Sequence, residues 1–157
     1  MLTPAAAVAA AFPILLIWAA AADIVSRSIP NSAVILLAAC YLVFAGSAGI
    51  GMGQIVSHLA CSCAVLAGGF ALYSQDLFGG GDAKLLACAA LWTGFDRILQ
   101  LLAGVALAGG GLSLIYLCAS CLGAGSSAGH ARPGTVPYGA AIAAGTLAAI
   151  PDCLTAF

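Results

Sequence analysis

Residues 4–22 read PAAAVAAAFPILLIWAAAA and contain no charged side chain. About 20 consecutive apolar residues are enough for one α-helix to cross the hydrocarbon core of a bilayer. Membrane β-strands instead alternate apolar and polar residues over about ten positions. Because this run is continuously apolar, it predicts a transmembrane helix, and similar runs recur along the chain.

The composition of the whole chain supports a membrane protein. Of 157 residues, 64% are hydrophobic and only 6% are charged, and the mean hydropathy is +1.17. An ordinary soluble domain has about 25% charged residues. So few charges cannot cover a soluble surface, which excludes a soluble enzyme, a nucleic-acid-binding protein and a disordered chain. The lipid bilayer is the expected environment, and a net charge of −1 indicates no nucleic-acid partner.

Charges, glycines and prolines divide the chain into about six apolar segments. They cover Pro4 to Ala22, the residues after Asn31 to about Ile50, Gln54 to Tyr73, Ala83 to Phe95, Ile98 to Leu122, and Tyr138 to near the C-terminus. This pattern predicts an all-α fold, a polytopic membrane helix bundle of about six transmembrane helices, with residues 1–157 forming a single domain. The fourth segment is short for a full span, so we expect it to begin below the membrane surface or to include part of the preceding glycine stretch.

The four basic residues indicate an orientation. Arg27, Lys84 and Arg132 fall on one side of this topology, whereas Arg97 falls on the other. Loops that carry Lys and Arg tend to face the cytoplasm. We therefore expect the first group to be cytoplasmic and the N-terminus to lie outside. The first cation comes after the first segment, so we do not expect that segment to be a cleavable signal peptide.

The seven cysteines and two histidines do not form a convincing metal site. Cys118 and Cys121 make one CxxC pair without a second pair, whereas zinc sites need about four ligands. We expect the cysteines to act as small apolar packing residues. His58 is expected to be a hydrogen-bonded histidine in the core or between helices. No metal and no cofactor are predicted.

Two of the five aspartates occupy unusual positions. Asp23 follows the first apolar segment and Asp82 precedes the fourth, so both are expected at the cytoplasmic ends of helices. An acidic side chain at the edge of the lipid is costly and is by default a candidate functional residue. Each also has a structural explanation, because Asp23 can pair with Arg27 and Asp82 can be a helix N-cap.

Two carboxyl groups that approach one another can hydrolyse a peptide bond. One carboxylate takes a proton from water, while the other, held protonated, polarises the peptide carbonyl; like charges close together favour this sharing of one proton. Gly79, Gly80 and Gly81 directly precede Asp82. Glycine adopts backbone angles closed to other residues and leaves room for an extended peptide. Asp23 and Asp82 are therefore candidate catalytic residues.

Three stretches resemble motifs of the type IV prepilin peptidase family, the membrane aspartic proteases of the GxGD type. DIVSRSIPN at residues 23–31 is similar to the motif of the first aspartate, and FGGGDAKL at residues 78–85 is similar to the GxGD motif with its following lysine. VPYGAAIAAG at residues 136–145 is similar to the start of the family's last helix. The three stretches occur in the order found in the family.

The resemblance implies that Asp23 and Asp82 are the catalytic pair. It also implies that the substrates are prepilins, from which a short basic leader is removed at the cytoplasmic face of the inner (plasma) membrane, just before the pilin's hydrophobic helix. Larger family members carry an extra cytoplasmic region with paired CxxC motifs and methylate the new N-terminus. This chain has no such insert, so no separate methyltransferase or zinc-binding part is expected. The compact form resembles the tight-adherence (Flp) pilus branch or the archaeal preflagellin enzymes, and the Pro-Tyr-Gly stretch favours the Flp branch.

Helix ends suggest how the two aspartates divide their roles. Asp82 starts a helix, where the positive dipole end favours a carboxylate, and Asp23 ends one, where the negative end favours the protonated acid. This makes Asp82 the base and Asp23 the acid. Lys84 is expected to stabilise the glycine stretch or to bind an acidic group of the substrate. The remaining alternative is that its side chain only reaches the membrane–water interface, where the ammonium group is hydrated. Arg27 is expected to orient Asp23 or only to set the topology.

Two other classes of protein fit the composition. Intramembrane acids also serve proton relays, so a small proton-coupled carrier or channel subunit is one alternative. Carriers usually contain repeats and helices broken near the midplane, neither of which the sequence shows. A non-catalytic pilus or secretion assembly subunit is the other alternative. Cleavage of a precursor separates the enzyme from both, and ion flux in liposomes separates the carrier from the assembly subunit.

Overall fold

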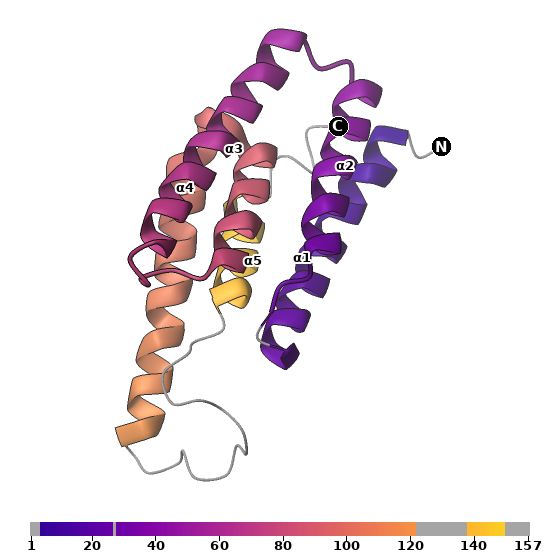
Figure 1. Cartoon of the computed structure of the whole chain (residues 1–157). Coiled ribbons are helices and arrows are strands. Elements are labelled where there is room, and N and C mark those ends of the chain that lie inside the picture. Colours follow the sequence, from indigo (N-terminus) through magenta and orange to yellow (C-terminus); the bar gives the residue numbers. More distant parts are fainter. Residues whose placement is uncertain (1–3, 27, 122–137, 150–157) are drawn as a thin grey trace.

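The computed structural model describes residues 4–26, 28–121 and 138–149 (Figure 1). Within these ranges all regular secondary structure is helical. The helices are α1 (Pro4–Ser26), α2 (Asn31–Ser47), α3 (Met52–Tyr73), α4 (Gly80–Cys121) and α5 (Tyr138–Ala149). The stretches Ala7–Ser26, Met52–Tyr73 and Gly80–Ala119 are long and apolar enough to cross a membrane, and α2 and α5 are shorter apolar helices. The predicted all-α membrane helix bundle is confirmed.

The longest helix, α4, is broken at Gly94. This residue has φ 63° and ψ −173°, a left-handed φ that glycine adopts without the steric cost of a Cβ atom. In Figure 1 the chain turns back at the break, so that the two halves of α4 run in opposite directions. The separation of the fourth and fifth apolar segments is therefore correct, although the break precedes the Asp96-Arg97 pair that marks it in the sequence.

One helix boundary differs from that expected, and an expectation for another is confirmed. α1 continues past Ala22 to Ser26, so Asp23 lies inside its last turns and does not end the helix. The Ser26 hydroxyl donates a hydrogen bond of 2.7 Å to the carbonyl of Ala22, which satisfies a backbone acceptor near the helix end. α4 begins at Gly80, so the short fourth segment does include part of the preceding glycine stretch, one of the two arrangements expected for it.

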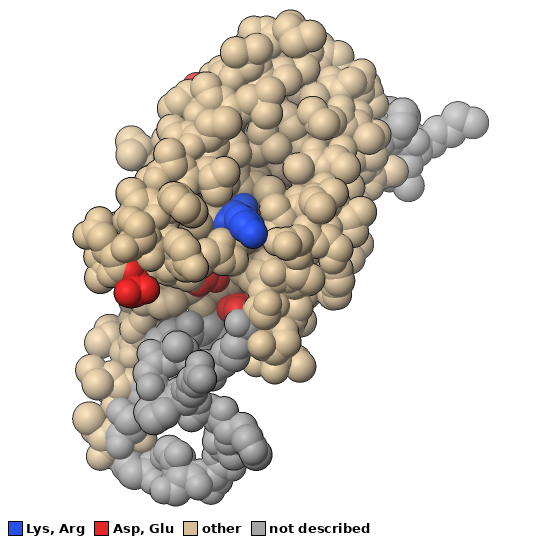
Figure 2. Space-filling view, in the orientation of Figure 1, with Lys and Arg blue, Asp and Glu red and all other residues tan. Residues whose placement is uncertain are grey.

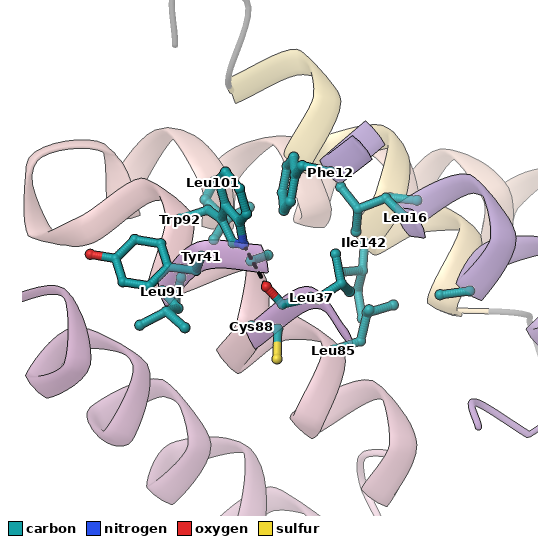
Figure 3. Close-up of a cluster of buried hydrophobic side chains, with 14 of the residues drawn as sticks. Phe12, Leu16, Leu37, Tyr41, Leu85, Cys88, Leu91, Trp92, Leu101 and Ile142 are labelled. Atoms are coloured by element: carbon teal, nitrogen blue, oxygen red, sulfur yellow. Dashed lines mark hydrogen bonds between the residues drawn. The ribbon is translucent and has the colours of Figure 1, made fainter. Parts of the chain in front are cut away.

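The core lies between α1, α2, α4 and α5 (Figure 3). Trp92 of α4 stands at its centre, where its ring contacts the rings of Phe12, Tyr41 and Phe44 at centroid distances of 4.3, 5.7 and 5.4 Å. The indole N–H of Trp92 donates a hydrogen bond of 3.1 Å to the carbonyl of Leu37, drawn as a dashed line in Figure 3. The bond gives the indole nitrogen of Trp92 the acceptor that neither lipid nor apolar side chains could provide.

Small residues bring α4 and α5 into direct backbone contact. A Cβ atom on Gly104 would lie 2.9 Å from the carbonyl oxygen of Gly145, and one on Gly145 would overlap the backbone of Val105. Helix pairs in lipid gain most of their association energy from such close packing of small residues. This contact anchors α5 along the second half of α4, and thereby fixes where the N-terminus of α5 points.

Candidate active site

A cavity of about 460 Å³ opens at one end of the bundle, where two helices end and two others begin. It lies between the C-terminal ends of α1 and α3 and the N-terminal ends of α2 and α4. Its lining residues are Asp23, Ser28, Ile29, Asn31, Tyr73, Gly79, Gly80, Gly81, Asp82 and Lys84. On the face shown in Figure 2, acidic and basic atoms gather around one recess in a surface that is otherwise largely uncharged. Both predicted catalytic residues, the glycine stretch and Lys84 thus belong to one site.

Asp23 is buried, with 7% of its surface exposed. Its Oδ2 atom accepts a hydrogen bond of 2.8 Å from the backbone N–H of Gly139, the second residue of α5. The first four N–H groups of any helix lack a partner within the helix. Asp23 therefore supplies, from α1, the acceptor that the start of α5 needs.

Asp82 is half-buried and lies in the first turn of α4. Gly79 lies against its carboxyl group, since a Cβ atom there would be 2.5 Å from the Oδ2 of Asp82. The carboxyl groups of Asp82 and Asp23 line the same cavity. Such a pair tends to share one proton, which is the state that water-activated peptide hydrolysis requires.

The structural explanations for the two aspartates fare differently. Asp82 is the third residue of α4, which begins at Gly80, so it is not the N-cap of this helix. Arg27, the proposed partner of Asp23, lies outside the described residues. An ion pair or a helix cap does not account for the positions of the two aspartates in the cavity. Both residues line it, and each has a glycine against its carboxyl group.

Lys84 contacts a neutral partner at the edge of the cavity. Its Nζ atom donates a hydrogen bond of 3.1 Å to the Oδ1 atom of Asn31, the first residue of α2. The side chain is exposed, so the ammonium group stays accessible from solvent. Of the roles considered for Lys84, the contact supports steadying the site, since it ties α4 to α2 beside Asp82.

The remaining glycines fit tightly against the walls. A Cβ atom on Gly80 would lie 3.3 Å from the ring of Tyr73, and one on Gly81 would lie 3.3 Å from the Cβ atom of Ile29. Tyr73, Ile29 and Gly139 were not singled out as site residues from the sequence. Ile29 and Gly139 do lie within the stretches that resemble family motifs, and this is the signal from which they could have been identified.

No group of three or more His, Cys, Asp or Glu side chains that could hold a metal ion occurs within residues 4–26, 28–121 and 138–149. Cys61 and Cys88 are buried and Cys40 is half-buried, as expected of packing residues. Cys63, Cys118 and Cys121 are instead exposed on the bundle surface. Cys153 and His130 lie outside the described residues.

A family model described as the Type IV leader peptidase family matches residues 10–129. The chain belongs to this family. The match includes Asp23, the glycine stretch and Asp82, and it ends before Gly139. No curated protein matches the chain, and no solved structure does. As a type IV leader peptidase, the protein is a protease, a hydrolase of peptide bonds, and the family acts in general on prepilins.

Proposed function

We propose that this type IV leader peptidase is a membrane-embedded aspartic endopeptidase, with Asp23 and Asp82 as its catalytic residues. One observation carries the proposal: two acidic side chains, far apart in the sequence, line one cavity at the end of an apolar bundle. A single buried acid has many explanations, whereas two carboxyl groups in one cavity suit the activation of one water molecule.

The reaction follows from this arrangement. A water molecule held between the two carboxyl groups gives a proton to the ionised carboxylate, and its oxygen bonds to the carbonyl carbon of the peptide. The protonated carboxyl group gives its proton to the carbonyl oxygen. The tetrahedral intermediate then collapses and the carbon–nitrogen bond breaks. The proton held by the first carboxylate passes to the leaving amine, and one hydroxyl proton of the intermediate returns to the second carboxylate, which restores the starting state. No metal or cofactor takes part in these steps.

The glycine stretch provides the binding surface in this proposal. A helical peptide keeps its carbonyl groups hydrogen-bonded, so the cleaved bond must be extended. Gly79, Gly80 and Gly81 carry no side chains and line the cavity beside Asp82, which lets an extended backbone approach the carboxyl groups. Lys84 steadies this stretch through Asn31. Arg27 is proposed to support Asp23 or to hold that end of α1 at the cytoplasmic surface.

The substrates are proposed to be prepilins of the Flp type, whose leader precedes a hydrophobic helix. The enzyme would lie in the inner membrane with the cavity facing the cytoplasm, where residues 1–157 act as a single peptidase domain without a methyltransferase part. The sided distribution of Arg27, Lys84 and Arg132 supports this orientation. The motif resemblance, in its compact form, supports the choice of substrate.

Three isosteric variants test the catalytic proposal. Asp23→Asn and Asp82→Asn keep the side-chain shape and remove the acid, so each should lower cleavage of a purified prepilin by about 1,000-fold or more. Asp76→Asn is the matched control, because Asp76 is exposed, does not line the cavity and has φ 56°, a conformation that asparagine tolerates. Wild-type cleavage by either of the first two variants would reject the proposal.

A labelling experiment tests the orientation. Gln75 lies in the exposed turn between α3 and α4, on the same end of the bundle as the cavity. In a cysteine-free chain, Gln75→Cys should react with a membrane-impermeant maleimide only after the inner membrane has been opened. Labelling in cells whose inner membrane is still intact would instead place the cavity on the face of that membrane opposite the cytoplasm.

A further inference from the structure

We infer that Gly139 is a positioning residue for Asp23, and that its backbone N–H fixes the place of the Asp23 carboxyl group in the cavity. The inference rests on the proposed catalytic role of the aspartates and extends it. It assigns a task to α5, whose residues lie beyond the matched part of the family model.

The contact between the two residues is buried and direct. Gly139 and Asp23 are both buried, and the N–H of Gly139 donates to the Oδ2 atom of Asp23 at 2.8 Å. A buried N–H group at the start of a helix cannot form a hydrogen bond to water instead. The loss of its acceptor, Asp23, would therefore leave the N–H of Gly139 without a partner, which is energetically costly. The start of α5 and the carboxyl group therefore hold one another in place.

This contact depends on glycine. A Cβ atom at residue 139 would lie 2.8 Å from both the Cβ and the Oδ2 atoms of Asp23, and 2.9 Å from its Cγ atom. Distances below 3.0 Å between such atoms do not persist, so a larger side chain would force Asp23 or the start of α5 to move. The position of the carboxyl group in the cavity is thus set by the absence of a side chain on another helix.

The first test separates turnover from substrate binding. Gly139→Ala in the full chain should lower kcat for prepilin cleavage at least ten-fold and leave KM within two-fold, because the carboxyl group moves while the substrate surface on the glycine stretch does not. Gly110→Ala is the matched control, since Gly110 also lies in a helix and has no atom within 4 Å of its would-be Cβ. An unchanged kcat, or a change in KM alone, would overturn the inference.

A second variant removes only the hydrogen bond. Replacing Gly139 by glycolic acid turns its amide into an ester, which deletes the N–H and adds no atoms near Asp23. This variant should also lose at least ten-fold in kcat, and a kcat within two-fold of wild type would overturn the inference even if the alanine variant fails to fold. The failure of the proposed function is a different result: there, Asp23→Asn itself would keep full activity. If Asp23→Asn is inactive and both Gly139 variants are fully active, only the role given to Gly139 is wrong.

Discussion

The Nδ1 atom of His58 lies 3.0 Å from the carbonyl oxygen of Leu91, three residues before the break in α4. A carbonyl oxygen only accepts hydrogen bonds, so Nδ1 carries a proton and is the donor. The ring stacks on Tyr41, with centroids 5.7 Å apart and planes inclined by 22°. His58 is therefore a hydrogen-bonded histidine between helices, as the sequence indicated, and it supports the chain where α4 turns back.

Replacing His58 should reduce stability without affecting catalysis. His58→Ala leaves the Leu91 carbonyl without this donor, which should lower the free energy of unfolding by about 1–3 kcal/mol. His58→Asn, whose amide can still donate near the Nδ1 position, should lower it less. Denaturation in detergent micelles measures both. Because His58 does not line the cavity, folded His58→Ala should cleave prepilin at the wild-type rate. Equal stability of the alanine variant and the wild type would contradict the role of the bond.

Gly94 should tolerate no side chain. Its φ of 63° and ψ of −173° combine into backbone angles that are essentially restricted to glycine, so another residue would cost roughly 1–3 kcal/mol. A Cβ atom would also lie 2.5 Å from the Nε2 atom of His58. Gly94→Ala should thus destabilise the bundle by about 2 kcal/mol or more, while Gly110→Ala should change it little. In a His58→Ala background the cost should shrink toward the backbone part alone. Strictly additive effects would show that the two residues do not touch.

Gly79→Ala should impair cleavage more than stability. The added methyl group would meet the Oδ2 atom of Asp82 at 2.5 Å, so the carboxyl group has to leave its position. Gly79 is exposed and precedes α4, so the free energy of unfolding should change by less than about 1 kcal/mol. We expect at least a ten-fold loss of kcat in the prepilin assay. Gly53→Ala, with nothing within 4 Å of its would-be Cβ, should be fully active. Comparable activity of the two variants would contradict the close approach to Asp82.

Lys84 and Asn31 should act as a pair. Lys84→Met keeps the length of the side chain but removes the donor, and Asn31→Ala removes the acceptor of the same 3.1 Å bond. Each change should lower kcat/KM a few-fold, and the double variant should be no worse than the poorer single variant, because one contact can be lost only once. Effects that multiply would show that Lys84 instead contacts an acidic group of the substrate directly. Steady-state kinetics on the four proteins distinguish these outcomes.

Local sequence accounted for the helices but not for their contacts. The apolar runs predicted α1, α2, α3 and both halves of α4, because lipid requires each spanning backbone to satisfy its own hydrogen bonds. The short fourth run even marked the break near Gly94. The end of the first helix was placed too early, at Asp23, since a charged residue does not stop a helix whose hydrogen bonds continue. The expectation that the fourth segment could include part of the glycine stretch was correct.

The site followed from the sequence only in part. That Asp23 and Asp82 would meet was expected from their common side of the membrane, and both line the cavity. The contact of Asp23 with Gly139 could not be predicted from either neighbourhood, because it depends on how α5 packs along Gly104 of α4. The helix-end argument took account of α1 alone, whereas the carboxyl group of Asp23 also contacts the start of α5. Tertiary packing, which no local pattern encodes, decided the surroundings of that carboxyl group.

The bond from Gly139 to Asp23 joins residues 116 positions apart. At the usual elongation rate of about 5–20 residues per second, the ribosome needs roughly 6–23 s to travel from one to the other. Throughout that interval Asp23 has been synthesised, but the backbone amide that holds its carboxyl group in the folded structure has not. With Gly139 as the positioning residue that we infer, a partly synthesised chain lacks this contact, and cleavage activity should appear only after α5 has been made.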